Sequence, residues 1–210
     1  MDIPAVFASE HRGSLVSGPG EFRGHIPFFT GDTVPFADAV SRIRPPQRMP
    51  VVVVDVDSLS SRRFTEGVLK GMRVRGSDIW FMTQIETADD VFDAFNTTAE
   101  AVLAPYHTIL SKADIADILD VSDSVIPAVF VSNGSAVTRS GPGDVRSIVD
   151  DLSGIGYYKM CIVDTDSSVS EYTWSTLADR YPSTVPFVFS NRCDGFGSRI
   201  VPFDPLTGRE

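Results

Sequence analysis

The feature that most constrains the fold is a repeat of short apolar segments, each followed by a few polar residues and then by a helix-like stretch. The segments are rich in Val, Ile and Phe, and their centres lie 22 to 31 residues apart. They are continuous rather than alternating, which is typical of strands covered on both faces. The six segments are Val51–Val56, Ile79–Ile85, Ala101–Pro105, Val125–Val131, Tyr158–Val163 and Val185–Phe189. The repeat therefore predicts an α/β chain with parallel strands.

Helix start signals fall between these segments. Thr87 and Ser111 are each followed three residues later by an aspartate, as in a capping box. We expect a helix after each of them, and further helices over Asp144–Leu152 and Glu171–Tyr181. We also expect a helix over Arg62–Lys70, after the first of the six segments.

The two ends of the chain decide how this sheet is arranged. Ile3–Ala8 and Ser198–Phe203 each fit a further strand, and with them the chain has eight, the number in a (βα)8 TIM-type barrel. Such barrels typically need about 250 residues, whereas this chain has 210. We therefore predict one α/β barrel domain over residues 1–210, with the seventh and eighth helices reduced or missing. The alternative is an open doubly wound parallel sheet, with residues 1–45 as an appendage.

Composition excludes several classes of protein. Hydrophobic residues make up 42% and charged residues 22%, which indicates a globular chain rather than a disordered one. The net charge of −10 repels phosphate backbones and anionic membranes, so we expect neither a nucleic-acid nor a membrane partner. No apolar run approaches the roughly 18 residues of a membrane span, and the first residues lack the basic segment of a signal peptide. We expect a soluble cytoplasmic protein, for which homo-oligomerisation stays open.

Polar residues follow the apolar segments, and in both arrangements the ligand site lies at the carboxyl ends of the strands. Because these ends point the same way, we expect several of the residues to line one pocket for a small-molecule ligand. The candidates for acid–base catalysis are Asp57, Glu86, His107 and Asp166, and those for ligand binding are Asp55, Gln84, Asn133, Asp164, Asn191 and Arg192. For any single residue, the alternative role is helix capping or solvation at the start of a loop.

Three pairs of these candidates share strand parity, so the members of each pair should face the same side. The pairs are Asp55 with Asp57, Gln84 with Glu86, and Asp164 with Asp166. Carboxylates that face each other can split their pKa values and act as acid and base.

Motifs for other chemistries are absent. Asp57, Glu86, Asp166 and His107 have groups that bind divalent cations, but they form no spacing motif, so we predict no metal site and no cofactor. The sequence has neither a glycine-rich phosphate loop nor the nucleophile elbow of hydrolases. His11 and His25 lie in a glycine-rich segment without a visible partner, which favours a surface or structural role.

Several segments, taken in order, resemble a known family. They are Ile3-Pro4-Ala5, Gly20–Pro27, Pro35–Ala39 and Val53-Val54-Asp55-Val56-Asp57. This order is similar to that of the phosphoribosylformimino-aminoimidazole-carboxamide ribotide isomerase family of histidine biosynthesis. Ala128–Ser132 and Ile162–Asp166 resemble that family's fifth and sixth strands. The resemblance spans most of the chain and implies a TIM-type barrel.

The residues that carry the family's chemistry are not matched. The family catalyses an Amadori rearrangement with one aspartate at the end of the first strand and another at the fifth. Phe7, and Ser132 or Asn133, stand in those places here. The family's Gly-rich phosphate-binding turns correspond to Thr83–Glu86 and Phe189–Arg192, which contain no glycine. The matching positions are Asp55, Asp57 and Asp164.

Two functions follow from different classes. The first is a divergent isomerase or lyase that acts on a small polar metabolite through carboxylate and histidine groups, without the histidine-pathway reaction. The second is a non-catalytic barrel that serves as a binding or assembly subunit. The loss of both expected aspartates favours the second, and the ring of ionisable residues favours the first. A concave pocket at the strand ends would favour the enzyme, and a filled one would favour the binding subunit.

Overall fold

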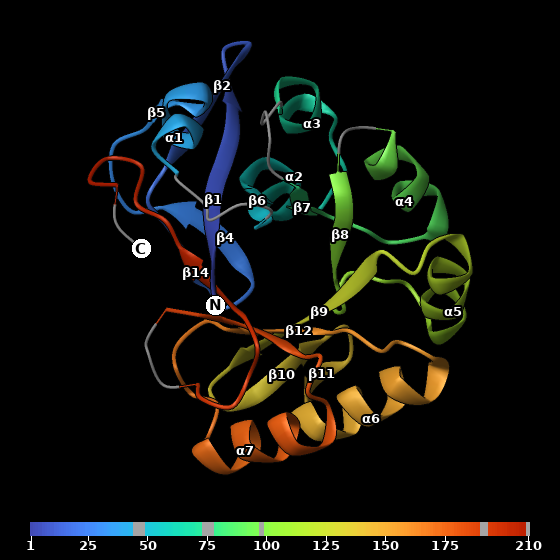
Figure 1. Cartoon of the computed structure of the whole chain (residues 1–210). Helices are drawn as coiled ribbons and strands as arrows, with labels where there is room; N and C mark the ends of the chain where they lie inside the picture. The colour runs from blue at the N-terminus through green and yellow to red at the C-terminus, as the bar shows by residue number, and fades with distance from the viewer. Residues whose placement is uncertain (44–48, 73–77, 97–98, 190–192, 209–210) are drawn as a thin grey trace.

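Eight parallel strands follow one another around a closed ring in this computed structural model, which describes residues 1–43, 49–72, 78–96, 99–189 and 193–208 (Figure 1). In chain order, the ring strands are β1 (Asp2–His11), β6 (Val51–Asp55), β7 (Ile79–Met82), β8 (Ala99–Pro105), β9 (Val125–Ser132), β12 (Cys161–Asp164), β13 (Val185–Val188) and β14 (Arg199–Pro202). The predicted α/β class and the closed eight-stranded barrel are confirmed.

Pairing between the two ends of the chain closes the ring. β1 pairs in parallel with β6 on one side and with β14 on the other, and β13 pairs with β14. Arg199 on β14 also donates two hydrogen bonds to the Asp2 carboxylate on β1, at 2.7 and 3.0 Å. The alternative of an open doubly wound sheet is therefore wrong, because the first strand is not part of an appendage.

Further strands extend the barrel at its carboxyl end. β2 (Ser14–Gly18) and β5 (Val34–Pro35) continue the sheet outward from β1. β10 (Ser135–Thr138) and β11 (Gly141–Gly143) continue it outward from β9. β3 (Gly20–Arg23) and β4 (Ile26–Phe29) pair only with each other and form a separate hairpin. The segment between β1 and α1 thus adds strands that the sequence pattern did not predict.

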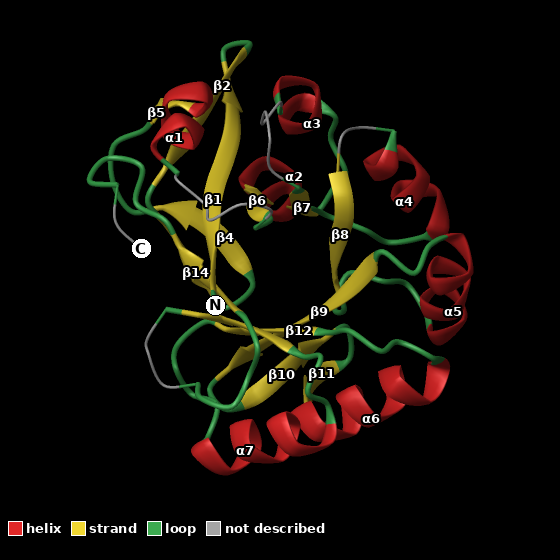
Figure 2. Cartoon of the chain, in the orientation of Figure 1, coloured by secondary structure: helices red, strands yellow, loops and turns green. Residues whose placement is uncertain are grey.

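Helices α4 to α7 follow the outer edge of the ring in Figure 2. In chain order, the helices are α1 (Phe36–Arg42), α2 (Val56–Ser61), α3 (Gly67–Gly71), α4 (Ala88–Phe95), α5 (Lys112–Val121), α6 (Val145–Ile155) and α7 (Glu171–Arg180). Thr87 and Asp90 form the expected capping box of α4, and Ser111 caps α5 by accepting from the Asp114 amide. None of the helices in the described part of the chain has the length and apolarity needed to cross a membrane.

The helix expected over Arg62–Lys70 is wrong. α2 begins immediately after β6 because the Asp55 carboxylate accepts from the Ser58 amide at 3.1 Å and caps it there. Arg62, in the left-handed conformation with φ +54°, ends α2, and only α3 follows as a short helix.

The last two barrel strands lack helices of their own within the described residues. No helix is described between β13 and β14 or after β14. Instead, the turn that follows β14 packs against α1, where the Arg42 guanidinium donates to the carbonyl oxygens of Pro205 and Leu206. The helix count is therefore below eight, as the length of the chain predicts.

Strand side chains alternate between the barrel interior and the helix-facing side. The interior is apolar and includes three fully buried rings, Phe7, Phe130 and Phe187. The outer sides of the strands pack against the helices in two further clusters. At the amino end of the barrel, Lys159 places its Nζ 3.9 Å from the centre of the Trp80 ring, a cation–π contact.

Candidate functional site

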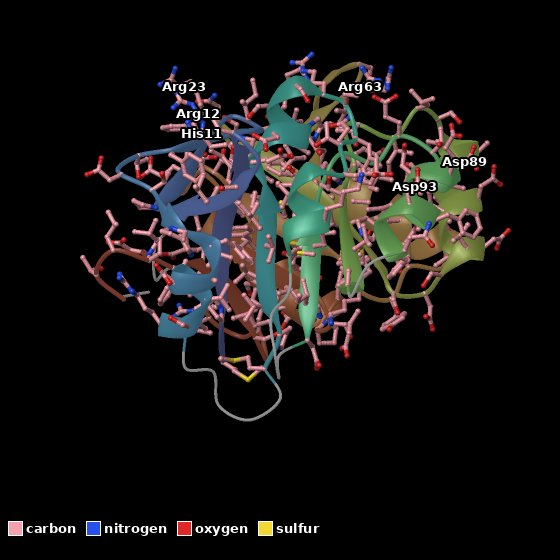
Figure 3. All side chains as sticks on the ribbon, turned by 90° about the horizontal axis from the view of Figure 1, so that it is seen from above. His11, Arg12, Arg23, Arg63, Asp89 and Asp93 are labelled. Carbon is pink, nitrogen blue, oxygen red and sulfur yellow. The ribbon has the colours of Figure 1, made fainter. Side chains whose placement is uncertain are left out.

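The carboxyl ends of the barrel strands gather at one end of the molecule, the upper edge of Figure 3, where His11 marks the end of β1. Arg12, Arg23 and Arg63 lie at the same end and are exposed. None of these arginines forms an ion pair with a carboxylate of the described residues. In characterised TIM-barrel enzymes, the active site lies at the corresponding end of the barrel.

Asp55 is buried beneath α2 rather than exposed at the mouth of the barrel. Its side chain is 0% exposed, caps α2 through Ser58, and accepts from the Thr83 hydroxyl at 2.9 Å. Burial raises the pKa of Asp55 to about 6, although the hydrogen bonds from Ser58 and Thr83 act in the opposite direction. Asp55 therefore connects β6, α2 and the segment after β7.

Asp57 lies in the first turn of α2, so the assumed strand parity with Asp55 is wrong. Its carboxylate accepts from the Ser9 hydroxyl at 2.7 Å and from the Glu10 amide at 2.6 Å. Both oxygens are thus used to fix the end of β1 against α2. Asp57 thus has a local structural role, which is the alternative to catalysis that applies to each candidate residue.

Asp164 and Asp166 hold the loops that follow β12 and β9. Asp164 accepts from the amides of Ser168 and Val169, and burial raises its pKa. Asp166 accepts from the Asn133 amide at 2.7 Å. Burial would raise the pKa of Asp166, but hydrogen bonds from Ser168, Asn133 and Ser132 outweigh it and lower that pKa. The pair does not share strand parity, because β12 ends at Asp164.

Asn133 contributes its backbone rather than its side chain to this arrangement. Asn133 and Gly134 have φ values of +52° and +73° and form the two-residue turn between β9 and β10. This sequence favours the type I′ turn, in which both central residues have positive φ. The Asn133 amide of the turn is the donor to Asp166.

Gln84 and Glu86 follow β7 but are not part of it, so strand parity does not apply to them either. The Gln84 side chain is 3% exposed, and its Nε2 donates to the Glu86 carboxylate at 3.2 Å. The Gln84 Oε1 atom is buried and accepts no hydrogen bond from the described residues. A buried acceptor without a donor is costly, which marks Gln84 as a group that a polar ligand could satisfy.

An aromatic side chain from the hairpin of β3 and β4 fills the centre of the barrel mouth. Phe22 is 6% exposed, and its ring centroid lies 5.1 to 6.0 Å from four other rings. Those rings come from four places on the barrel: Phe7, Phe130, Phe187 and Phe189. At Gly20, where the hairpin begins, a Cβ atom would overlap the Phe7 ring, so glycine permits the close approach.

The tip of the same hairpin places His25 over His107. Gly24, with φ +64°, opens the two-residue turn, which positions His25 beside the barrel. The two imidazole centroids are 4.5 Å apart, and His107 contacts the Phe130 ring edge-on at 5.2 Å. The Arg62 guanidinium donates to Nε2 of His25 at 3.3 Å.

The surroundings of both histidines favour the neutral form of the imidazole. Burial lowers the pKa of each, and the nearby Arg62 charge lowers both further; His107, which also faces His25, has its pKa lowered to about 3. Nδ1 of His107 is buried and has no partner among the described residues. His107, beneath the tip of the hairpin, and Gln84, on the segment after β7, therefore each have a polar atom that is unpaired among the described residues.

A cavity lies outside the barrel, between the loop after β12 and the start of α7. It has a volume of about 240 Å³, and its lining includes Asp164, Ser168, Glu171 and Trp174. Its floor includes Val188, which belongs to the helix-facing cluster rather than to the barrel interior. The cavity is therefore separate from the position of Phe22.

Phe22, His25 and Arg62 were missed as site residues by the analysis of apolar segments. A signal for the hairpin was present, because Gly24-His25 separates two short runs with alternating aromatic or apolar residues. Two predicted binding residues, Asn191 and Arg192, lie outside the described residues. Among the residues that are described, no three His, Cys, Asp or Glu side chains come together in a way that could hold a metal ion.

The arrangement at the mouth thus combines an aromatic plug with two neutral imidazoles and an unpaired amide oxygen. These groups can exchange hydrogen bonds with a polar ligand, whereas the carboxylates expected to carry acid–base chemistry are bound to neighbouring donors. Neither a scan against protein-family models nor a search of the curated proteins returned a match to this chain.

Proposed function

We propose that this chain is a non-catalytic binding barrel, divergent from the histidine-biosynthesis isomerase family it resembles. It would take a small polar molecule at the carboxyl end of the barrel without carrying out the histidine-pathway reaction. The observation that supports this proposal is the packing of the Phe22 ring against the rings of four barrel residues: Phe7, Phe130, Phe187 and Phe189. A substrate at the centre of the mouth would have to displace that ring.

The state of the carboxylates supports the same proposal. A general acid or base must reach the proton that it transfers, with a pKa suited to the working pH. Asp57 and Asp166 accept from backbone amides at 2.6 and 2.7 Å. Asp55 is fully buried beneath α2. Their hydrogen bonds support local structure, which does not require catalysis.

The ligand class follows from the unpaired atoms. The unpaired Oε1 atom of Gln84 can accept a hydrogen bond from a ligand, and the unpaired Nδ1 of His107 can accept or donate one, depending on the tautomer. A ligand with hydroxyl or amine donors would satisfy both atoms once the hairpin makes room for it. The imidazoles add no charge in the neutral form that their surroundings favour, so we propose a polar ligand recognised mainly through hydrogen bonds.

A divergent isomerase or lyase is the second candidate. The observation that favours it is the unpaired Nδ1 of His107, because a neutral imidazole in a buried setting can transfer protons. In this candidate, His107 would act with the Glu86 carboxylate that lies on the adjacent loop.

One experiment separates the two functions. The purified chain is incubated with a panel of sugar phosphates, hydroxy acids, keto acids and amino acids, and each mixture is followed by NMR. We expect shifts in the ring signals of His25 and His107 with at least one compound, and no product. Turnover of a compound by the wild type, lost in the His107→Gln variant, would establish the enzyme instead. The absence of any ring shift across the panel would contradict a small polar ligand at the mouth.

A further inference from the structure

The hairpin of β3 and β4 is held at the mouth by side-chain contacts rather than by strand pairing. Within the described residues, neither of its strands pairs with a barrel strand. Its contacts with the rest of the described chain include the Phe22 ring among the barrel aromatics and His25 on His107. The Ser60 hydroxyl also donates to the Pro27 carbonyl at 3.1 Å, and Arg62 donates to His25 at 3.3 Å. These are side-chain contacts, so opening the hairpin leaves every ring strand paired.

Three groups that carry, or can gain, a positive charge meet where the hairpin touches the barrel. The rings of His25 and His107 are 4.5 Å apart, and Arg62 donates to His25 Nε2 at 3.3 Å. His25 accepts that hydrogen bond only while Nε2 is unprotonated. Protonation of the pair would replace a contact between two neutral rings and a hydrogen bond with repulsion among three cations.

In the part of the chain that the structure describes, no carboxylate is paired with these groups to offset the repulsion. Glu86, on the loop after β7, accepts from Gln84, and Asp57 on α2 accepts from Ser9 and Glu10. On the β10 side, Arg139 donates to the Thr108 carbonyl at 3.1 Å and adds another positive charge to this end of the barrel.

We propose that the hairpin of β3 and β4 is a proton-released lid, held closed by neutral His25 and His107 and opened when both take up protons. Opening would uncover Gln84, His107 and the aromatic centre of the mouth. The role of the lid in admitting a ligand rests on the proposed binding function, whereas its opening by acid does not.

The direction and size of the pH effect follow from linkage. Burial and Arg62 lower the pKa of both histidines in the closed form, that of His107 to about 3, from an ordinary value of 6.5. The open form binds protons more tightly, so the closed form is favoured above pH 6.5 and loses its advantage as the pH falls below that value. If opening returns His107 alone from a pKa of about 3 to its ordinary value of 6.5, the ratio of open to closed molecules rises roughly thirtyfold between pH 8 and pH 5.

Hydrogen exchange followed by mass spectrometry tests the lid in the full chain. Exchange of the hairpin, residues 20–29, is divided by exchange of α6, residues 145–155, at each pH from 8 to 5 to remove the intrinsic pH effect. We expect the ratio to rise at least tenfold toward pH 5 in the wild type and in the control His11→Gln, whose histidine is exposed on the β1 turn. A constant ratio in the wild type would overturn the proposal.

Ring-replacement variants test whether the histidines are responsible. His25→Phe keeps a ring over His107 but cannot gain a proton, so its pH response should be smaller than that of the wild type. His25→Phe with His107→Phe should show none, and an undiminished response in the double variant would overturn the proposal. If the double variant does not fold, NMR titration of the three histidine rings of the wild type decides the question. His25 and His107 should then titrate together with the change in hairpin exchange, and titration without that change would refute the lid.

The outcomes separate the lid from the proposed function. Acid opening together with metabolite turnover would keep the lid and reject the non-catalytic barrel. A pH-independent hairpin together with ligand binding and no turnover would reject the lid and keep the binding function.

Discussion

At the scale of single residues, four aspartates near the carboxyl end of the barrel accept hydrogen bonds from nearby groups. The donors lie either a few residues away in the chain or at the end of a neighbouring strand. Asp55, Asp57, Asp164 and Asp166 each accept from at least one backbone amide. Hydrogen bonds to charged acceptors are stronger than those between neutral groups, so each carboxylate fixes the loop that it contacts. Phe22 has the corresponding role among the apolar residues, because it joins the hairpin to four positions on the barrel.

Replacing Phe22 tests this role. We expect Phe22→Ala to lower the free energy of unfolding by about 3 kcal/mol, because it empties a buried aromatic site. Phe92→Ala is the matched control, since Phe92 is 57% exposed on α4, and it should change that free energy by less than about 0.5 kcal/mol. Urea denaturation measures both. Equal effects of the two substitutions would show that the Phe22 ring is not seated in the mouth.

Asp55 should give the stability a dependence on pH. Its pKa is raised from 3.8 to about 6 in the folded chain. Its contribution is therefore fully present below pH 3.8 and is lost as the pH rises through about 6. Between pH 4 and pH 7, the free energy of unfolding of the wild type should change by about 2–3 kcal/mol relative to Asp55→Asn, which is neutral throughout. As the pH rises, the wild type should therefore lose stability relative to Asp55→Asn.

Comparison of the two unfolding curves removes the opposing effect of the histidines, which both proteins share. The control is Asp93→Asn, at an exposed position of α4, whose pH profile should run parallel to that of the wild type. A parallel profile for Asp55→Asn as well would show that the Asp55 carboxylate is not held in a desolvated site.

At the scale of elements, short hydrogen-bonded loops position one strand end against the next. The turn between β9 and β10 is held by Asp166 from the loop after β12, and the end of β1 is held by Asp57 on α2. Each contact joins two neighbouring strands of the ring at the carboxyl end. The rim of the barrel is thus fixed by polar contacts, while its interior is fixed by apolar ones.

We expect Asp57→Asn combined with Asp166→Asn to fold and to be about 1–2 kcal/mol less stable than the wild type. Each asparagine keeps one acceptor oxygen but loses the charge that strengthens the hydrogen bond. Amide exchange should increase most near Glu10 and Asn133, whose amides donate to the two carboxylates. A double variant at the exposed positions Asp93 and Asp117 is the control. A gain in stability of the first variant would show that repulsion among the carboxylates outweighs their hydrogen bonds.

At the scale of the whole molecule, the eight parallel strands close into a ring, and Phe22 lies among the aromatic residues at its carboxyl end. The resemblance to the isomerase family would place Phe7, and Ser132 or Asn133, where that family has its two aspartates. Phe7 is fully buried and contacts Phe22, so it contributes to the plug rather than to proton transfer.

Genetic complementation tests the absence of the histidine-pathway reaction. Expressed in a strain that lacks the isomerase, this chain should not restore growth without histidine, because it lacks both aspartates of the resembling family and its mouth is filled. An authentic isomerase is the positive control, and immunoblotting confirms expression of the chain. Restored growth would contradict the prediction and the proposed function together.

The amino-acid sequence by itself determined the alternation of strands and helices along the chain, and with it the order of the barrel strands. This information is local: continuous Val- and Ile-rich runs predict buried strands, and Thr87 and Ser111 mark helix starts through hydrogen bonds within one turn. Local signals also located the polar residues at the carboxyl end. They did not show that α2 begins at Val56, because Val56 continues the apolar run from Val51. Asp55 within that run indicated a strand end, although it caps the Ser58 amide three residues later.

Only the tertiary structure decided what these polar residues contact. Phe22 and Phe187 are 165 positions apart in the chain, and His25 and His107 are 82 apart, yet each pair is in contact at the barrel mouth. Such contacts depend on how the ring closes and where the hairpin folds back, and no periodic pattern records either. The sequence therefore determined the barrel and the end at which a site would lie. The three-dimensional packing decided that this end is filled by an aromatic ring and bordered by two neutral histidines.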